Sequence, residues 1–275
     1  AIPALTPFSN LTTILGSQAA ENIQGYGQIQ SMVVNLTHNS AQKCGLANGY
    51  GLQDYAVTSL VTTMCENLNG RILGAAETVS MACPLPCLLS NAEKLIPLFI
   101  MPLTRIQLSV DAMANIFSSA VAGAGLSLVN VELCYDQIDF GVAVEQMVRS
   151  MGDKIYIKSS SFAANSNTLA AGTSGTQNLL FNTRLSSVRS LFTIFGGTSA
   201  QSLNKLFDSY DVTQSSGSYQ YQIGGINYPA RPVSTVNCRN AIMMENRLAI
   251  GSFRGATTDF SISPVEFSYA GNAVT

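Results

Sequence analysis

The chain has 275 residues, of which 47% are hydrophobic and only 11% are charged, and its formal net charge is −2. Soluble proteins carry on average about 25% charged residues, and direct charge-driven binding of nucleic acid, which needs a basic face, is not expected from this balance. A surface so poor in charge suits a protein that is largely covered by neighbouring subunits, because the cores of interfaces are depleted in charged residues.

A membrane span is not predicted, although the mean hydropathy is +0.23. The most apolar run, Leu95 to Leu103, is nine residues long and contains two prolines, whereas a spanning helix needs about 20 residues. Residues 112–131 are uncharged, but Ser, Asn and Gly recur throughout them. The hydrophobic content is therefore expected to form a core and covered surfaces.

The first half of the chain is predicted to be β-rich. Residues 1–16 indicate a partial strand, and residues 26–35 favour a short helix. From Arg105 to Val110 polar and apolar residues alternate, which predicts a half-buried strand. Alternation returns from Val129 to Asp136 and predicts a second such strand.

At Gly141 the pattern changes its period. Apolar residues from Val142 to Met151 recur at helical spacing, and Glu145 and Arg149 lie four residues apart, which predicts a short amphipathic helix. We expect this helix to connect two β-rich halves.

The second half is predicted to continue with strands. KIYIKSSSF at residues 154–162 and the apolar stretch at residues 186–195 both favour strands. Gly224 and Gly225 stand between two alternating runs, which predicts a tight hairpin, because both turn positions need positive φ. Pro229 and Pro232 are expected to end the pairing.

Six cysteines raise the question of a metal site or of disulfides. The closest pair is Cys83 and Cys87, but a structural zinc site needs four ligands and the only histidine is His38. We therefore expect reduced, structural cysteines made in an intracellular compartment, with one late disulfide as the open alternative. The other four are isolated in the sequence: Cys44, Cys65, Cys134 and Cys238.

No catalytic, cofactor-binding or metal-binding residue is assigned, and the chain is not expected to be an enzyme. A nucleophile needs a nearby base, and His38 lies in a polar loop without a nucleophile elbow. Asp139-Phe140-Gly141 spells a kinase triplet, but no catalytic-loop or lysine motif accompanies it. The remaining candidates are interpreted as loop glycines and solvated carboxylates: Gly45, Gly49, Gly51, Asp208, Asp211 and Glu245.

The order of the motifs carries a resemblance. LIPLFIMPL precedes RIQLSV, and LVNVELCYDQIDF, a short helix, KIYI, RLSSVRSLF and INYPARPV follow. In this order they resemble the major capsid proteins of icosahedral DNA viruses with the double jelly-roll fold, in particular those of polinton-like viruses and virophages. The similarity covers about Ile23 to Val233 and is sharpest over Leu128 to Phe140 and Gln222 to Val233.

The resemblance implies a mainly β protein in which two antiparallel β-sandwich jelly rolls stand side by side, with short helical connectors. It places a first jelly roll at residues 1–140, lacking its N-terminal strands, a linker helix at 141–152, and a second jelly roll at 153–275, lacking its C-terminal strands. Both would be incomplete in these 275 residues.

The same resemblance implies a virion protein, assembled inside the host cell, that forms homotrimers and tiles a shell of pseudo-hexagonal capsomers. Its partners would be further copies of itself, together with minor capsid, cement and penton proteins, and an internal membrane beneath the shell is compatible with it. No sequence-specific binding of nucleic acid is implied.

Two other classes stay open. A β-sandwich receptor-binding or lectin-like module, as in a penton or spike, would use tyrosine-rich loops around Tyr219, Tyr221 and Tyr228. An enzyme would need His38 or a carboxylate pair in a pocket, and His38→Ala would then abolish turnover.

Overall fold

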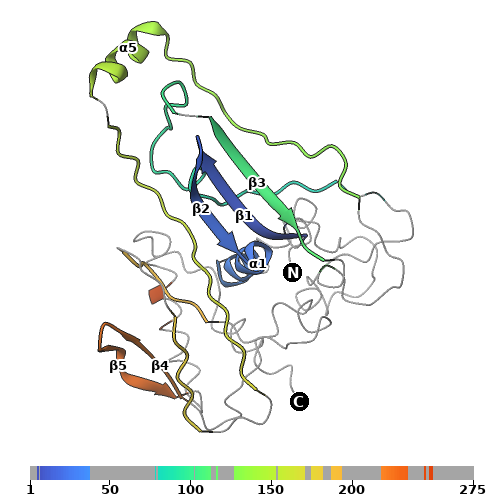
Figure 1. Cartoon of the computed structure of the whole chain (residues 1–275), viewed down its shortest axis with the longest axis vertical. Helices are drawn as coiled ribbons and strands as arrows, with labels where there is room; N and C mark the ends of the chain where they lie inside the picture. Colours follow the sequence, from blue (N-terminus) through green and yellow to red (C-terminus); the bar gives the residue numbers. More distant parts are fainter. Residues whose placement is uncertain are drawn as a thin grey trace, which may run out of the picture.

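The computed structural model (Figure 1) describes residues 5, 7–37, 78, 80–101, 103–112, 116, 127–152, 154–170, 175–181, 187–193, 218–234, 245, 248 and 249. Its regular structure there is mainly antiparallel β-sheet with few helices, which confirms the predicted mainly β, antiparallel class. The two jelly rolls stay a prediction. The strands form a three-stranded sheet in the order β2-β1-β3 and a separate hairpin of β4 and β5.

The three-stranded sheet contains β1 (Phe8–Leu15), β2 (Gln18–Gln24) and β3 (Thr104–Val110). The sequence predicted β1 and β3. It did not predict β2, because only Glu21 and Ile23 of that strand point into the protein and one of the two is charged. A tight turn at Gly16, which has a φ of 65°, joins β1 to β2.

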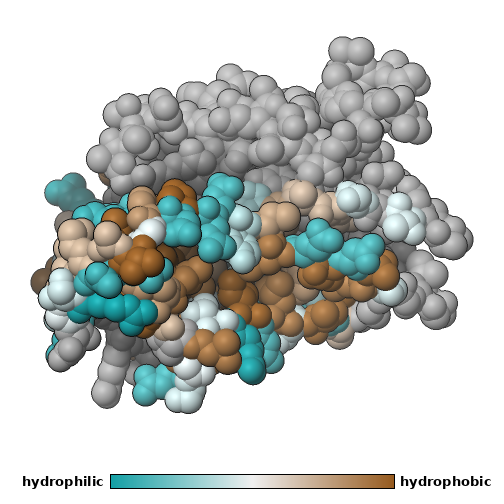
Figure 2. Space-filling model, turned by 90° about the horizontal axis from the view of Figure 1, so that it is seen from above, coloured by the Kyte–Doolittle hydropathy of each residue, from teal (hydrophilic) through white to brown (hydrophobic). Residues whose placement is uncertain are grey.

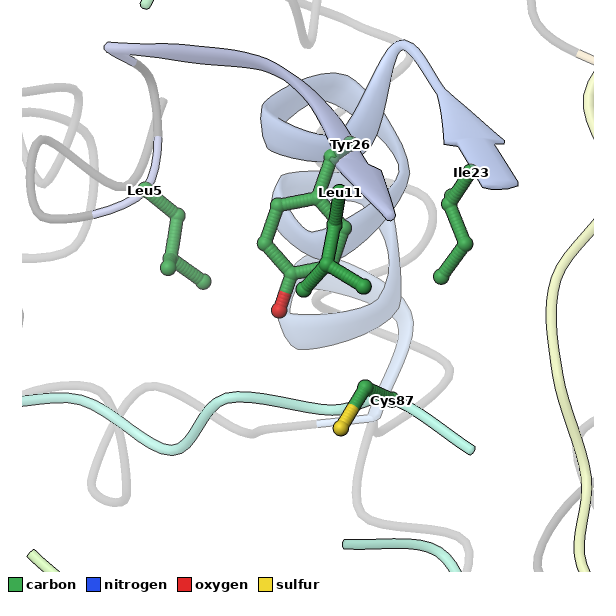
Figure 3. Packing of buried hydrophobic residues seen from close by; sticks show 5 residues of the cluster. All are labelled: Leu5, Leu11, Ile23, Tyr26 and Cys87. Carbon is green, nitrogen blue, oxygen red and sulfur yellow. The ribbon is translucent and has the colours of Figure 1, made fainter. Parts of the chain in front are cut away.

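A small hydrophobic core lies where the sheet meets helix α1 (Tyr26–Thr37), which confirms the helix predicted there. Leu11 from β1, Ile23 from β2 and Tyr26 from the start of α1 are fully buried. Figure 3 shows the Tyr26 ring beside Leu11, with its hydroxyl directed toward the segment that carries Cys87. Burying a side chain of this size stabilises a fold by about 1.5–3 kcal/mol.

The strand predicted from Val129 to Asp136 is the main departure from expectation. Asn130 has a φ of 53° and interrupts the extended backbone, a conformation that Asn tolerates better than most residues. The alternating residues lie in no sheet, and Val131 and Tyr135 are 70% and 68% exposed. The prediction of a half-buried strand was wrong because no described element covers its apolar face.

Helix α5 (Val142–Ser150) confirms the predicted amphipathic helix. Gly141, with a φ of 77°, makes the turn into it, and the Asp139 carboxylate accepts a hydrogen bond from the Gly141 N–H at 2.8 Å. The helix buries no side chain. Arg149 connects it to Phe99, because its guanidinium donates to the Phe99 carbonyl at 3.3 Å and lies 5.5 Å from the centroid of the Phe99 ring.

Residues 154–162 form no strand, so that prediction was wrong. Their second part instead runs along residues 87–93. Ser159 Oγ donates to the Leu88 carbonyl at 2.5 Å, Asn91 Nδ2 donates to the Ser160 carbonyl at 3.0 Å, and the Glu93 N–H donates to the Lys158 carbonyl at 3.1 Å. Such side-chain bonds compete with strand pairing. Residues 187–193 of the other predicted strand are likewise outside any sheet.

The predicted hairpin is confirmed as β4 (Ser218–Ile223) and β5 (Ile226–Ser234). Gly224 and Gly225 have φ values of 57° and 84°. The two prolines do not end the pairing, contrary to prediction, because β5 continues to Ser234 and pairs Val233 with Tyr219. A two-stranded sheet has a free outer edge, where proline removes no ladder hydrogen bond.

None of the helices in the described residues is long and apolar enough to cross a membrane. The predicted domain boundary at residues 141–152 stays a prediction.

Candidate functional site

Most residues weighed for catalysis or phosphate binding lie outside the described part of the chain: His38, Gly45, Gly49, Gly51, Asp208 and Asp211. Asp139 is described, and its carboxylate accepts the Gly141 N–H at the start of α5. Within the described residues no group of three or more His, Cys, Asp or Glu side chains could hold a metal ion.

A buried carboxylate, that of Glu21, accepts hydrogen bonds from three other described residues. Glu21 is 5% exposed, and one of its oxygens accepts hydrogen bonds from Thr13 Oγ1 at 2.8 Å and from the Leu88 N–H at 2.9 Å. The other oxygen accepts from Ser161 Oγ at 2.5 Å. A buried carboxylate is tolerated only when it is well bonded in this way. We call Glu21, Thr13, Leu88 and Ser161 the Glu21 hub.

The Glu21 hub joins β1 and β2 to segments far along the chain. Leu88 is 67 residues from Glu21 in sequence, and Ser161 is 140 residues from it. Sequence reasoning did not detect this cluster, because an isolated glutamate in a mixed polar stretch gives no signal of partners so distant. Both carboxylate oxygens accept hydrogen bonds from protein donors, so we interpret the role of the hub as structural.

Beside the hub, a tyrosine and two thiols are packed in the core. The Tyr26 hydroxyl donates to the Pro86 carbonyl at 3.2 Å. Burial raises the pKa of Tyr26, and the nearby Cys87, Cys83 and Glu21 raise it further. Burial also raises the pKa of the Cys83 thiol to about 11, so at neutral pH this thiol is protonated and a poor nucleophile.

Replacing Tyr26 by phenylalanine tests this environment. The variant is expected to lose about 1 kcal/mol of unfolding free energy at pH 7, since it loses one hydrogen bond. The raised pKa means that the phenol stabilises the fold fully below about pH 10, where the unfolded phenol titrates, and that this contribution disappears as the pH rises further. Tyr26→Phe should therefore lose less stability than wild type between pH 10 and pH 11.

Urea unfolding followed by circular dichroism at pH 7 and at about pH 11 measures this difference. Cys83→Ala is the matched control. The raised pKa of the Cys83 thiol means that wild type begins to lose the stabilising contribution of this thiol above the usual thiol value of 9.0. Cys83→Ala should lack this earlier loss and keep the loss that is due to Tyr26. If wild type and Tyr26→Phe lose the same amount of unfolding free energy between these two pH values, the phenol is not buried.

The hairpin tyrosines occupy a second polar and aromatic cluster. The rings of Tyr219 and Tyr221 meet edge to face with centroids 6.0 Å apart, and the Tyr221 hydroxyl lies 2.8 Å from Thr193 Oγ1. Burial raises the pKa of Tyr219, with smaller effects of Tyr221 and Glu245. Tyr228 stays 49% exposed. Of the three tyrosines, Tyr228 is thus the most open to a ligand.

A small ion cluster lies where residues 93 and 158 meet. Lys158 Nζ is 2.8 Å from Glu93 Oε1, and an Arg189 guanidinium nitrogen is 3.6 Å from the same oxygen. The hydrogen bond from Lys158 lowers the pKa of Glu93, assisted by both positive charges. Exposed pairs of this kind contribute little to stability.

The most extensive feature is exposed apolar surface on two extended segments. We call residues 131–140 the acidic strip, because Glu132, Asp136 and Asp139 are its only charges. We call residues 154–158 the basic strip, after Lys154 and Lys158. The large apolar side chains of the two strips are 39–91% exposed: Val131, Leu133, Tyr135, Ile138, Phe140, Ile155, Tyr156 and Ile157.

The exposure of these strips is part of a wider pattern. Figure 2 shows hydrophobic residues at the surface in patches between hydrophilic ones. Leu95, Leu98 and Leu103 of the apolar LIPLFIMPL segment are also more than half exposed. Monomeric soluble proteins rarely leave contiguous apolar patches beyond a few hundred Å² open to water. On other proteins, patches of this kind mark sites of protein–protein or membrane interaction or ligand-binding grooves.

Comparison of the chain with protein-family models, with curated proteins and with solved structures found no match in any of the three.

Proposed function

We propose that this chain is a structural subunit of an icosahedral viral capsid, built on two jelly rolls, that trimerises into pseudo-hexagonal capsomers. The single observation that carries the proposal is the exposed apolar surface from Leu128 to Ile157 on a chain with only 11% charged residues. Monomeric soluble proteins rarely expose such a surface, and in a capsid a neighbouring subunit would cover it.

The motif order supports the same function. The two sharpest pieces of the resemblance, residues 128–140 and 222–233, correspond to the acidic strip and the hairpin. Antiparallel sheet is the architecture that jelly rolls require, and the described strands pair antiparallel.

The proposed mechanism is mechanical. Obligate interfaces bury on the order of 2,000 Å² or more, and repeated contacts of that size would hold a shell together without any chemistry. Each subunit must resist deformation by the forces that its neighbours exert in the shell. The Glu21 hub serves this need, because it ties β1 and β2 to residues 88 and 161.

Negative-stain imaging of the concentrated chain tests the proposal. We expect hexagonal arrays or closed shells built from particles with threefold symmetry. Uniform, separate particles of single-chain size at every concentration would contradict it.

A second candidate function is recognition by a penton or spike. It is favoured by the hairpin tip, where Ile226 and Tyr228 are 61% and 49% exposed. A module of this kind would bind a glycan or receptor, and Tyr228→Ala would abolish that binding without changing the oligomeric state. Screening the chain against immobilised glycans therefore separates the two functions.

A further inference from the structure

We propose that the acidic strip of one copy pairs, as an antiparallel β-strand, with the basic strip of the next copy. This inference rests on the proposed function, since it names the surfaces by which the subunits join. Head-to-tail contacts of this type close into rings when the rotation between copies allows it, and a trimer is such a ring.

The acidic strip has the properties of a strand without a partner. Its apolar and polar residues alternate from Val131 to Asp136, and its backbone is extended after the interruption at Asn130. Among the described residues, 131–138 take part in no hydrogen bond. A row of unpaired backbone groups readily accepts a strand from another chain.

The basic strip has the same properties with the opposite charge. Residues 154–157 take part in no hydrogen bond with any described part of the chain, and Tyr156 is 91% exposed. Lys158 is paired with Glu93, but its side chain is 71% exposed. An exposed pair of this kind is weak and exchangeable, so Lys158 can turn to a second carboxylate.

The two strips match residue by residue. In an antiparallel register that sets position 134 opposite position 156, apolar residues oppose apolar residues on one face, with Leu133 opposite Ile157 and Tyr135 opposite Ile155. On the other face each carboxylate opposes a lysine, with Glu132 opposite Lys158 and Asp136 opposite Lys154. Aromatic with β-branched and opposite-charge cross-strand pairs both stabilise sheets.

Within one chain the two strips are held apart. In Figure 1 they leave α5 in different directions and run on opposite sides of the three-stranded sheet. The residues that follow the basic strip are fixed to the first half of the chain by Ser159 with Leu88 and by Ser161 with Glu21. In this structure the two strips of one chain form no hydrogen bond with each other.

The two strips supply part of the surface that a joint between subunits needs. A standard interface buries about 800 Å² on each partner. The eight large apolar side chains of the two strips are 39–91% exposed, and each offers on the order of 100 Å². In one joint the acidic strip of one copy and the basic strip of the next together offer about 800 Å², roughly half of the total that a standard interface buries on its two partners, so surface beside the strips supplies the rest of the contact.

Crosslinking through a native thiol tests the pairing. Cys134 is exposed and unpaired in the acidic strip. A tagged wild-type copy is co-expressed with an untagged copy that carries Tyr156→Cys together with Cys134→Ser, and the mixture is mildly oxidised. Opposed strand residues have Cα atoms about 4.5–5.5 Å apart, a separation that a disulfide spans. A disulfide between Cys134 and the introduced cysteine can form only between two copies.

We expect a covalent dimer whose joined peptides contain positions 134 and 156, identified by mass spectrometry. The control copy carries Asn227→Cys with Cys134→Ser, because Asn227 is exposed on the hairpin and lies in neither strip. The Tyr156→Cys copy should give roughly tenfold more crosslink to Cys134 than this control.

The other outcomes overturn the inference in distinguishable ways. Oligomers that form without this crosslink would show that another surface joins the copies, while the proposed capsid function would stand. A chain that remains monomeric would overturn both. A disulfide within one chain, seen when Tyr156→Cys is combined with native Cys134 in a monomer, would show that the strips pair in the same molecule.

Charge exchange checks the register. Asp136→Lys should weaken self-association roughly tenfold, since it places like charges opposite each other, and adding Lys154→Asp should restore it to within about threefold. A parallel register would instead set Glu132 opposite Lys154. Rescue of Glu132→Lys by Lys154→Asp, without rescue of Asp136→Lys, would overturn the antiparallel pairing.

Discussion

Replacing Glu21 by alanine is expected to lower the free energy of unfolding by about 3–5 kcal/mol, one of the largest effects available to a single substitution. The carboxylate accepts three hydrogen bonds in a buried position. Its removal would leave the Thr13 hydroxyl and the Leu88 N–H without their acceptor, and each unsatisfied buried group costs about 1–3 kcal/mol. Urea unfolding monitored by circular dichroism measures the loss.

Two matched variants distinguish the effect of losing the hub's hydrogen bonds from the effect of losing a negative charge. Ser161→Ala removes one donor at the edge of the hub and should cost about 1 kcal/mol. Glu93→Ala removes an exposed carboxylate in a surface ion pair and should leave the unfolding transition unchanged. Equal effects of Glu21→Ala and Glu93→Ala would contradict the structural role of the hub.

Replacing Leu133 by aspartate is expected to weaken self-association about a hundredfold, because central apolar residues of an interface contribute 2 kcal/mol or more. Leu133 is 58% exposed in the acidic strip, so the substitution should leave the fold of the single chain intact. Sedimentation equilibrium measures the dissociation constant of the variant.

Ile226→Asp is the matched control, because Ile226 is 61% exposed but belongs to the hairpin and to neither strip. This variant should associate like wild type and keep the same circular dichroism spectrum. If both aspartate variants associate equally well, the acidic strip is not the interface.

Local signals were sufficient to predict several elements. The alternation in Arg105 to Val110 gave β3, the helical spacing after Gly141 gave α5, and Gly224-Gly225 gave the hairpin. These patterns succeed because the partner of each residue is close in sequence or is simply the protein interior. In β2 the same rule failed, because the inward-facing Glu21 disguises the alternation.

The rest depends on contacts between distant residues, which no local pattern encodes. Residues 131–136 and 154–158 have strand-like sequences but lie in no sheet, because no described strand pairs with them. The Glu21 hub depends on Ser161, which is 140 residues away. No pattern of residue types in one segment predicts such a contact.

Sedimentation velocity of the purified chain, over a concentration series and at low and high salt, tests self-association most directly. We predict a trimer at micromolar concentration that grows into larger assemblies as concentration rises. A single boundary with the mass of one 29.1 kDa chain, unchanged at every concentration and salt, would contradict the capsid assignment.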